Sequence, residues 1–223
     1  MLGRIERDRA AAEKPKYVVF LGDLIDRGPD SCRVIERLRL YASKGVKPVF
    51  LFGNHEEAFL RVLGGDSALL ADWLRYGGDA CAASYGIDPA RLLAELPQTA
   101  LGQLQSAVPK AHIDFLQSFA DSFRYGDYLF VHAGIRPGLS IEDQSPQDLR
   151  WIRDAFLHDT KDHGVIVVHG HTIVSEVEER VNRIGIDTGA YRTNRLTALG
   201  IEGRERWFLE SRANPVDPQR SEG

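Results

Sequence analysis

The chain has 223 residues and a net charge of −4, from 28 basic and 32 acidic side chains. Its composition, 43% hydrophobic and 27% charged, is typical of a globular fold and excludes a disordered chain. No apolar run is long enough to cross a bilayer, residues 1–16 lack the apolar core of a secretory signal, and two cysteines are too few for a disulfide framework. We therefore expect a cytoplasmic protein, and its weak negative charge argues against nucleic acid as a partner and, with no spanning segment, against a membrane.

Strands and helices are predicted to alternate along the chain. Four short apolar runs, each followed by glycine and polar residues, indicate strands buried on both faces. They are Tyr17–Leu21, Pro48–Phe52, Tyr128–Val131 and Val165–Val168. Helical periodicity indicates helices at Ser31–Ser43, with Ser31 as N-cap, and at Glu56–Leu63, Ala68–Tyr76 and Ala111–Phe123. Three further strands follow in close succession, which favours antiparallel pairing: Arg183–Asp187, Leu196–Ile201 and Glu205–Leu209.

These elements predict an α/β fold with a central β-sandwich of mixed sheets flanked by helices. A single domain is expected over residues 1–212. Within it, residues 66–108 are helical and loop-like, which predicts a cap inserted between core strands. The last segment, 213–223, has two prolines and several charges and predicts a flexible tail.

The ends of four predicted strands carry candidate metal ligands. These are Asp23, Asn54, His132 and His171. Alone, each residue is explained as well by a turn or by a structural histidine. Together they combine carboxylate, amide oxygen and imidazole, a set that suits Mn²⁺, Fe or Zn²⁺. Because sheets bring the ends of several strands to one edge, the four residues predict one metal site.

Three residues beside these ligands are candidates for phosphate chemistry. The planar guanidinium of Arg27 can clamp a phosphate oxygen. His55 follows a metal ligand directly and, held by Asp26, can protonate a leaving group as general acid. Two simpler explanations stand beside these roles: Asp26 and Arg27 can form an ion pair that closes their turn, and His55 can be a hydrogen-bond partner of the metal ligands.

The ordered motifs resemble those of a known family. The segments Gly22–Gly28 (G-D-x-x-D-R-G), Gly53–Glu56 (G-N-H-E), His132–Gly134 (H-A-G) and Gly170–Thr172 (G-H-T) are similar to the motifs of calcineurin-like metallophosphoesterases. Within that family the chain is most similar to bacterial PPP-type serine/threonine protein phosphatases. The stretch Asp148–Arg153 also resembles a family segment, usually L-W-I-R, whose final arginine contacts phosphate.

The resemblance implies a role for each of these residues. Asp23 bridges two divalent metal ions, with Mn favoured over Fe or Zn, and Asn54, His132 and His171 complete one metal position. His55 is the general acid, with Asp26 behind it. Arg27 and Arg153 hold the phosphoryl oxygens, and Asn54 is also assigned to substrate binding. Attack on phosphorus by metal-bound hydroxide is the implied reaction.

One family motif is absent from this sequence. The family begins with a strand that ends in G-D-x-H-G, whose Asp and His bind the second metal. We therefore expect the first strand of the fold to be missing and leave open whether only one ion is retained. Two explanations compete: the recorded start lies downstream of the true start, which we favour, or the chain is natural and has weak or no catalysis.

Three functions are consistent with this sequence. The leading hypothesis is hydrolysis of a phosphomonoester, phosphoserine or phosphothreonine in proteins above all. The alternative enzyme is a dinucleotide polyphosphate hydrolase acting on diadenosine tetraphosphate, which would need extra basic or aromatic contacts in the cap. The third is a phosphate- or metal-binding relative without turnover. The physiological substrate, the native metal and the oligomeric state are not determined by the sequence.

The remaining histidines and the cysteines are assigned no chemistry. His169 is either a further ligand or a hydrogen-bond partner of a ligand. We expect three histidines on the surface, namely His112, His158 and His163. Cys32 and Cys81 are expected to be buried structural thiols.

Overall fold

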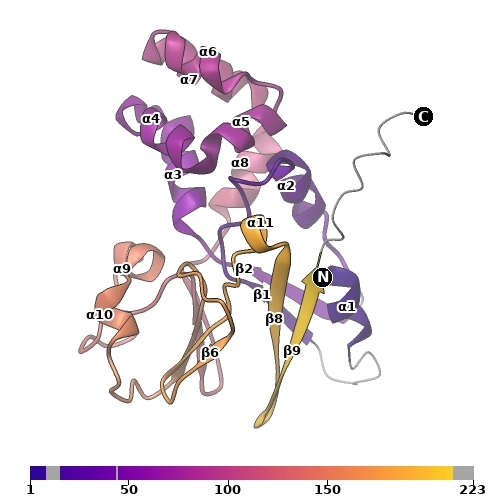
Figure 1. The fold of residues 1–223 in the computed structure, drawn as a ribbon, viewed down its shortest axis with the longest axis vertical. Coiled ribbons are helices and arrows are strands. Elements are labelled where there is room, and N and C mark those ends of the chain that lie inside the picture. The colour runs from indigo at the N-terminus through magenta and orange to yellow at the C-terminus, as the bar shows by residue number, and fades with distance from the viewer. Residues whose placement is uncertain (9–15, 44, 213–223) are drawn as a thin grey trace.

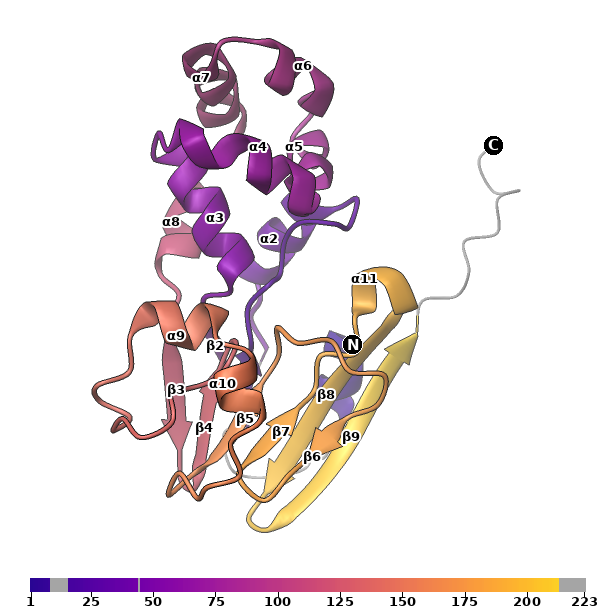
Figure 2. The same cartoon turned by 60° about the vertical axis from the view of Figure 1, so that its left-hand side comes forward.

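The structure is a computed structural model that describes residues 1–8, 16–43 and 45–212 (Figure 1). Strands occupy one end of the molecule and most of the helices between residues 54 and 117 gather at the other (Figures 1 and 2). The predicted α/β fold with mixed sheets flanked by helices is confirmed. The predicted tail 213–223 lies outside the described residues. Among the described residues, no helix is long and apolar enough to span a membrane.

A parallel pair of strands opens the sheet region. β1 (Lys16–Phe20) pairs in parallel with β2 (Val46–Phe50), and α2 (Ser31–Arg39) forms the crossover between them. The rings of Phe20 and Phe50, which are partners in this register, stack with centroids 4.6 Å apart. Both strands run toward the same edge, so the loops that follow them begin side by side.

A second, five-stranded sheet has the order β3-β4-β5-β7-β6. Its strands are β3 (Ser122–Tyr125), β4 (Tyr128–Val131), β5 (Ile166–His169), β6 (Glu178–Glu179) and β7 (Arg183–Gly185). The three central strands, β4, β5 and β7, are mutually parallel and largely buried, while the edge strands are antiparallel. Two short helices, α9 (Pro146–Trp151) and α10 (Asp154–Leu157), cover one face through Leu149 and Phe156.

The other face of this sheet packs against further strands. The antiparallel hairpin β8 (Arg195–Glu202) and β9 (Glu205–Arg212) contributes Leu199 and Ile201 to a cluster with Val168 and Ile184. Tyr17 of β1 packs on the rings of β3, 5.4 Å from that of Phe123. The hairpin and the β1–β2 pair therefore lie over one face of the five-stranded sheet, as in a sandwich.

The helical end of the molecule has its own hydrophobic core. Around α3 (Asn54–Leu63) lie the elements of residues 67–117. These are η1 (Ser67–Leu69), α4 (Leu70–Trp73), the kinked turn η2 (Leu74–Gly78), α5 (Asp79–Ser84), α6 (Pro89–Ala94), α7 (Pro97–Ala107) and α8 (Lys110–Gln117). Phe59, Leu104 and Leu116 are fully buried at its centre. Two further short helices among the described residues are α1 (Leu2–Arg7) and α11 (Ala190–Thr193).

Three local predictions were wrong. Ser31 does not cap α2: it is the first helical residue, and its Oγ accepts a hydrogen bond from the backbone N–H of Asp26. The helix expected to reach Phe123 ends at Gln117, because Phe123 pairs with Phe130 in the β3–β4 hairpin. Antiparallel pairing joins β8 to β9 as expected, but β7 is parallel to β5 and antiparallel to β6.

A cavity of about 1560 Å³ lies between the two layers. It is lined along its length by β1, by β8 and by the inner face of β4, including Val18, Phe130 and Leu199. Among the described residues, β1 pairs only with β2 and β8 only with β9, so each strand has one edge without a ladder partner. At one end the cavity reaches the loops that follow β1, β4 and β5.

Candidate active site

Four loops after strand ends meet at one point. Asp23 follows β1, Asn54 opens α3 after β2, His132 follows β4 and His171 follows β5. The first two loops touch backbone to backbone, because a Cβ on Gly22 would lie only 2.5 Å from the backbone nitrogen of Gly53. Glycine at position 22, with φ of +83°, therefore allows the approach that brings Asp23 beside Asn54.

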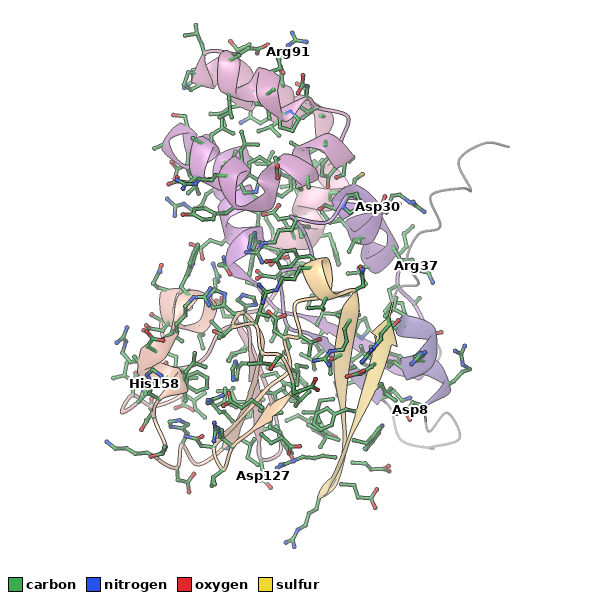
Figure 3. The ribbon with its side chains drawn as sticks, viewed as in Figure 1. Asp8, Asp30, Arg37, Arg91, Asp127 and His158 are labelled. Carbon is green, nitrogen blue, oxygen red and sulfur yellow. The ribbon has the colours of Figure 1, made fainter. Side chains whose placement is uncertain are left out.

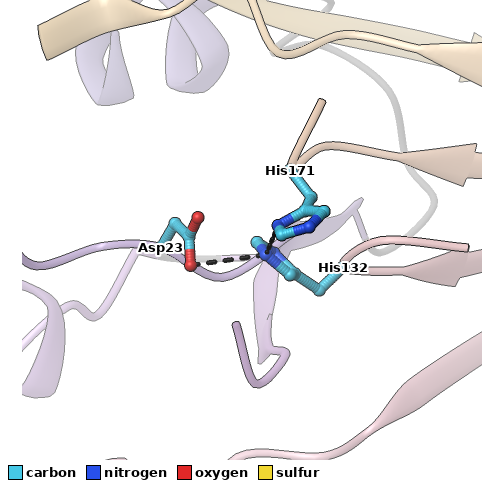
Figure 4. A group of neighbouring side chains, drawn as sticks. All are labelled: Asp23, His132 and His171. Carbon is cyan, nitrogen blue, oxygen red and sulfur yellow. Dashed lines mark hydrogen bonds and ion pairs between the residues drawn. The ribbon is translucent and has the colours of Figure 1, made fainter. Parts of the chain in front are cut away.

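His132 is the centre of the predicted ligand group. Its Nε2 lies 3.1 Å from Oδ1 of Asn54, 3.2 Å from Nδ1 of His171 and 3.3 Å from Oδ1 of Asp23. Figure 4 shows His132 between Asp23 and His171, whose side chains point toward it. One ligand atom from each of these three residues lies within 4.8 Å of the other two. All four residues predicted as metal ligands are thus brought together.

The hydrogen bonding of this group fits a cation. Nδ1 of His132 donates its proton to the carbonyl oxygen of Leu21 at 2.6 Å, so the neutral ring presents a lone pair at Nε2. Around that lone pair lie further acceptors from Asn54 and Asp23, which repel one another unless a positive charge lies between them. A mixed set of imidazole, carboxylate and amide oxygen suits a divalent transition metal, and the backbone carbonyl orients the imidazole as such sites require.

The protonation states of Asp23 and His171 suit this role. Burial opposes ionisation of Asp23, but the imidazoles of His132 and His55 outweigh it and hold the pKa of that carboxyl well below its usual range. Burial, reinforced by His132 and Arg153, lowers the pKa of His171 to about 3. Burial also works against a charge on His132, yet Asp23 raises its pKa overall. The site therefore holds an ionised carboxylate and a neutral imidazole at His171 at neutral pH.

Glu56, to which the sequence analysis gave no role, ties two of the loops together. Its buried carboxylate accepts hydrogen bonds from the backbone N–H groups of Asp23 at 2.9 Å, Leu24 at 2.6 Å and Gly53 at 2.8 Å. The bond to Gly53 is half of a capping box, with Glu56 at the third position of α3. A glutamate three residues after a strand-end glycine was the signal that could have identified it.

His55 and Asp26 form a buried pair. Nδ1 of His55 lies 2.6 Å from Oδ2 of Asp26, which also accepts a hydrogen bond from the indole N–H of Trp73 at 3.2 Å. Burial opposes the charged form of His55, but the bond to Asp26 and the charge of Asp23 raise its pKa overall. Burial raises the pKa of Asp26, and the bond to His55 opposes this. The arrangement leaves Nε2 of His55 as the ring atom that can exchange a proton with a substrate.

The two predicted phosphate-binding arginines are both exposed near the ligand group. Arg27 lies at the end of the large cavity with its guanidinium 4.7 Å from the ring centroid of Tyr191 in α11. Arg153, the N-cap of α10, donates to Oγ1 of Thr172 at 3.3 Å, next to His171. Its charge contributes to the low pKa of His171.

The backbone at the site is in an unusual conformation. Five non-glycine residues among those described have positive φ, and four of them are Asp23, Asp26, Arg27 and His171. Such a conformation costs about 1–3 kcal/mol per residue and persists only where surrounding contacts impose it. The residues with positive φ therefore cluster where the candidate functional side chains cluster.

The remaining histidines lie away from the ligand group. His169 is buried, donates from Nδ1 to the carbonyl of Gly170 and has Nε2 3.5 Å from Arg183. It lines a separate cavity of about 690 Å³. His158 is exposed at the end of α10 (Figure 3), and His163 is half-buried. The surface prediction for His112 was wrong, because this side chain is buried between Tyr85 and Glu36.

The cysteines agree only in part with expectation. Cys81 is buried, and burial together with the nearby Asp26 raises the pKa of its thiol. Cys32 is half-buried rather than buried, because it lies near the start of α2 on its more exposed side.

The sequence motifs and the site geometry define a family. The chain matches the calcineurin-like phosphoesterases over residues 2–196 and belongs to this family of metal-dependent hydrolases. It is 27% identical over 205 residues to the asymmetrical bis(5'-nucleosyl)-tetraphosphatase PrpE of Anoxybacillus flavithermus, an alignment that covers 87% of this chain and 79% of the relative.

A solved structure shares the fold. A provisionally assigned diadenosine tetraphosphatase has a TM-score of 0.60 at 19% sequence identity, over 94% of this chain and 86% of that one. A metallophosphoesterase from Sphaerobacter thermophilus has a TM-score of 0.49 at 17% identity, over 96% and 84% of the two chains.

Proposed function

We propose that this chain is a metal-dependent hydrolase of dinucleoside polyphosphates, with diadenosine tetraphosphate as the reference substrate. The observation that carries this proposal is the similarity to a bis(5'-nucleosyl)-tetraphosphatase across 87% of the chain. It reverses the order of the two enzyme hypotheses drawn from the sequence, in which a phosphoprotein substrate came first.

The surroundings of Arg27 support the same substrate class. A dinucleotide polyphosphate requires basic or aromatic contacts beyond those of a single phosphate, and two exposed tyrosines lie beside Arg27. Tyr191 stacks on its guanidinium, and the backbone carbonyl of Tyr76 in the cap accepts its Nε–H at 3.4 Å. Arg75 adds a positive charge next to the ring of Tyr76. Nucleobases stack on such rings, a contact worth about 1–3 kcal/mol per base in nucleic-acid binding.

In this proposal each site residue has a defined task. Asp23, Asn54, His132 and His171 hold a divalent ion, which when bound activates water and stabilises charge on the phosphoryl group. Arg27 and Arg153 bind non-bridging phosphoryl oxygens through charge-assisted hydrogen bonds, and Asn54 also faces the substrate. His55 donates the proton on Nε2 to the leaving oxygen, while Asp26 accepts the hydrogen bond from Nδ1 and thereby orients the ring.

A comparison of substrates tests the proposal. The purified chain is assayed with Mn²⁺ on diadenosine tetraphosphate, on a phosphoserine peptide and on p-nitrophenyl phosphate, with His55→Asn as the control. We expect the dinucleotide to have the highest kcat/KM and His55→Asn to lower kcat by about 10²–10⁴-fold. Preference for the phosphopeptide would restore the protein phosphatase hypothesis. Phosphate binding without turnover on any substrate would identify a binding protein.

A further inference from the structure

One short turn of the predicted cap contacts the loop that follows β1. Helix α4 ends at Trp73, and the kinked turn η2 follows immediately, from Leu74 to Gly78. From this turn and the tryptophan before it, three groups reach the loop after β1: the indole N–H of Trp73 and the carbonyl oxygens of Tyr76 and Gly77. None of these contacts is between neighbours in sequence, so they dock the cap onto the loop.

The first contact fixes Asp26. Its Oδ2 accepts from Nδ1 of His55 at 2.6 Å and from the indole of Trp73 at 3.2 Å, and all three side chains are buried. An indole N–H can only donate, so it holds one carboxylate oxygen in place for His55 whatever the state of the histidine. Trp73 is itself fixed by stacking on Phe59, with ring centroids 5.3 Å apart.

The second contact fixes Arg27. Its backbone N–H donates to the carbonyl of Gly77 at 2.8 Å, and its Nε–H lies 3.4 Å from the carbonyl of Tyr76. Gly77 has φ of +116°, and a Cβ at this position would lie 2.4 Å from Cγ of Arg27. Both the conformation and the close approach therefore require glycine.

A kink explains how one segment reaches both residues. Two helical segments meet within η2, where Tyr76 and Gly77 have non-helical dihedral angles. Their carbonyls are thereby free to accept from the loop. Asp26 and Arg27 are adjacent residues with φ of +69° and +63°, a conformation that outside contacts must maintain.

We propose that the turn Trp73–Gly78 is a positioning element for the reaction: Trp73 orients Asp26, and through it the proton-donating ring of His55, while Gly77 sets the direction of Arg27 toward phosphate. This rests on the roles of His55 and Arg27 under the proposed function. The contact of Trp73 with Asp26 is the first arm of this element, and the contact of Gly77 with Arg27 is the second. Loss of the first should change proton donation and loss of the second should change phosphate binding, a difference that a loss of stability alone would not produce.

Trp73→Phe tests the first arm. The variant keeps a ring on Phe59 and removes the N–H. A general acid matters more for a poorer leaving group, so kcat for phenyl phosphate, whose phenol has a pKa of about 10, should fall about 5–10-fold more than kcat for p-nitrophenyl phosphate. KM should change less than twofold. Trp207→Phe is the matched control, since Trp207 donates to Asp8, remote from His55. Equal losses on both substrates would overturn the role of Trp73.

Gly77→Ala tests the second arm with inorganic phosphate as the probe. Displacing Arg27 should weaken phosphate binding, measured by titration calorimetry, about 3–10-fold, while the ratio of the two aryl phosphate rates stays unchanged. Gly45→Ala is the control for a glycine with positive φ and open space around it. Unchanged phosphate affinity in a folded Gly77→Ala chain would overturn this arm.

A spectroscopic measurement keeps the proposal falsifiable without turnover. The Nδ1–H proton of His55 in its short bond to Asp26 should give a separate downfield NMR signal in the wild-type chain, absent in His55→Asn. This signal should broaden or shift in Trp73→Phe and stay unchanged in Trp207→Phe. A signal that is unchanged in both variants would refute the proposal. None of these probes contains a dinucleotide, so failure to cleave diadenosine tetraphosphate would refute the proposed substrate and leave this inference standing.

Discussion

Removal of the Glu56 carboxylate should separate the two loops that carry Asp23 and Asn54. Glu56 is fully buried and accepts from three backbone N–H groups, those of Asp23, Leu24 and Gly53. In Glu56→Ala all three donors lose their partner. We expect both a loss of stability and a loss of metal affinity, because Asp23, a proposed metal ligand, is one of the residues released.

The size of the effect follows from the number of bonds. Burial raises the pKa of Glu56, so part of the advantage of an ionised acceptor is already lost, and each bond is assigned about 1 kcal/mol. Glu56→Ala should then lower the free energy of unfolding by about 3 kcal/mol. Glu56→Gln retains one oxygen, which can keep the bonds to Asp23 and Gly53, while its amide faces the N–H of Leu24. We expect a loss of about 1–2 kcal/mol for this variant.

Urea unfolding in the presence of EDTA measures these differences without a contribution from metal. Titration calorimetry with Mn²⁺ then measures affinity, which should fall about 10–100-fold in Glu56→Ala, as for other partners that orient metal ligands. Exposed Glu142→Ala is the control and should stay within about 0.5 kcal/mol of the wild type. If Glu56→Ala unfolds like the control, or if Glu56→Gln is as unstable as Glu56→Ala, the reasoning from three bonds is wrong.

Three further predictions concern the metal, pH and substrate. Mn²⁺ at about 100 times its Kd should stabilise the chain by about 2.7 kcal/mol in thermal unfolding, and His132→Ala should lose most of this gain; an equal gain in both would contradict the assigned ligand. Burial lowers the pKa of His169 to about 4, from 6.5 in an unfolded chain, so the folded state favours the neutral ring. Its contribution to stability is therefore present above pH 6.5 and is lost as pH falls toward 4, by roughly 3 kcal/mol, a slope that His169→Gln should flatten in urea titrations of the metal-free chain. Tyr191→Ala should raise KM for diadenosine tetraphosphate about 5-fold or more and leave KM for p-nitrophenyl phosphate unchanged, as expected if the ring stacks on a base; equal changes would exclude that contact.

The strand ends were predictable from sequence because two local signals coincide there. An apolar run of four or five residues followed by glycine and a polar residue marks both the strand and its exit. The bounds of β4 match the prediction residue for residue, and the four ligand candidates lie together. Parallel strands of one sheet end at a common edge, which brings Asp23 beside Asn54 and His132 beside His171. The packing of the two sheets against each other then joins the two pairs.

The contacts that support the site were not predictable in the same way. Trp73 reaches Asp26 across 47 residues, and no local pattern distinguishes it from an ordinary core tryptophan. Glu56 did carry a local signal, its capping position at the start of α3. Strand β3 carried one as well, the Gly-Asp turn between Tyr125 and Tyr128, but the helical periodicity of the preceding residues obscured the strand. His112 was misplaced because a polar residue on a helix is buried only when distant partners satisfy it.

The wide spacing of the proposed metal ligands along the chain bears on how the protein folds. Asp23 and His171 are 148 residues apart, and each of the four proposed ligands follows a different strand. Closing loops of this length costs entropy that only the assembled sheets repay, so the ligands converge late in folding. A cation that binds them has nothing equivalent to hold in the unfolded chain or in early intermediates. Metal binding should therefore slow unfolding far more than it accelerates folding, so that the bound ion stabilises the folded state kinetically.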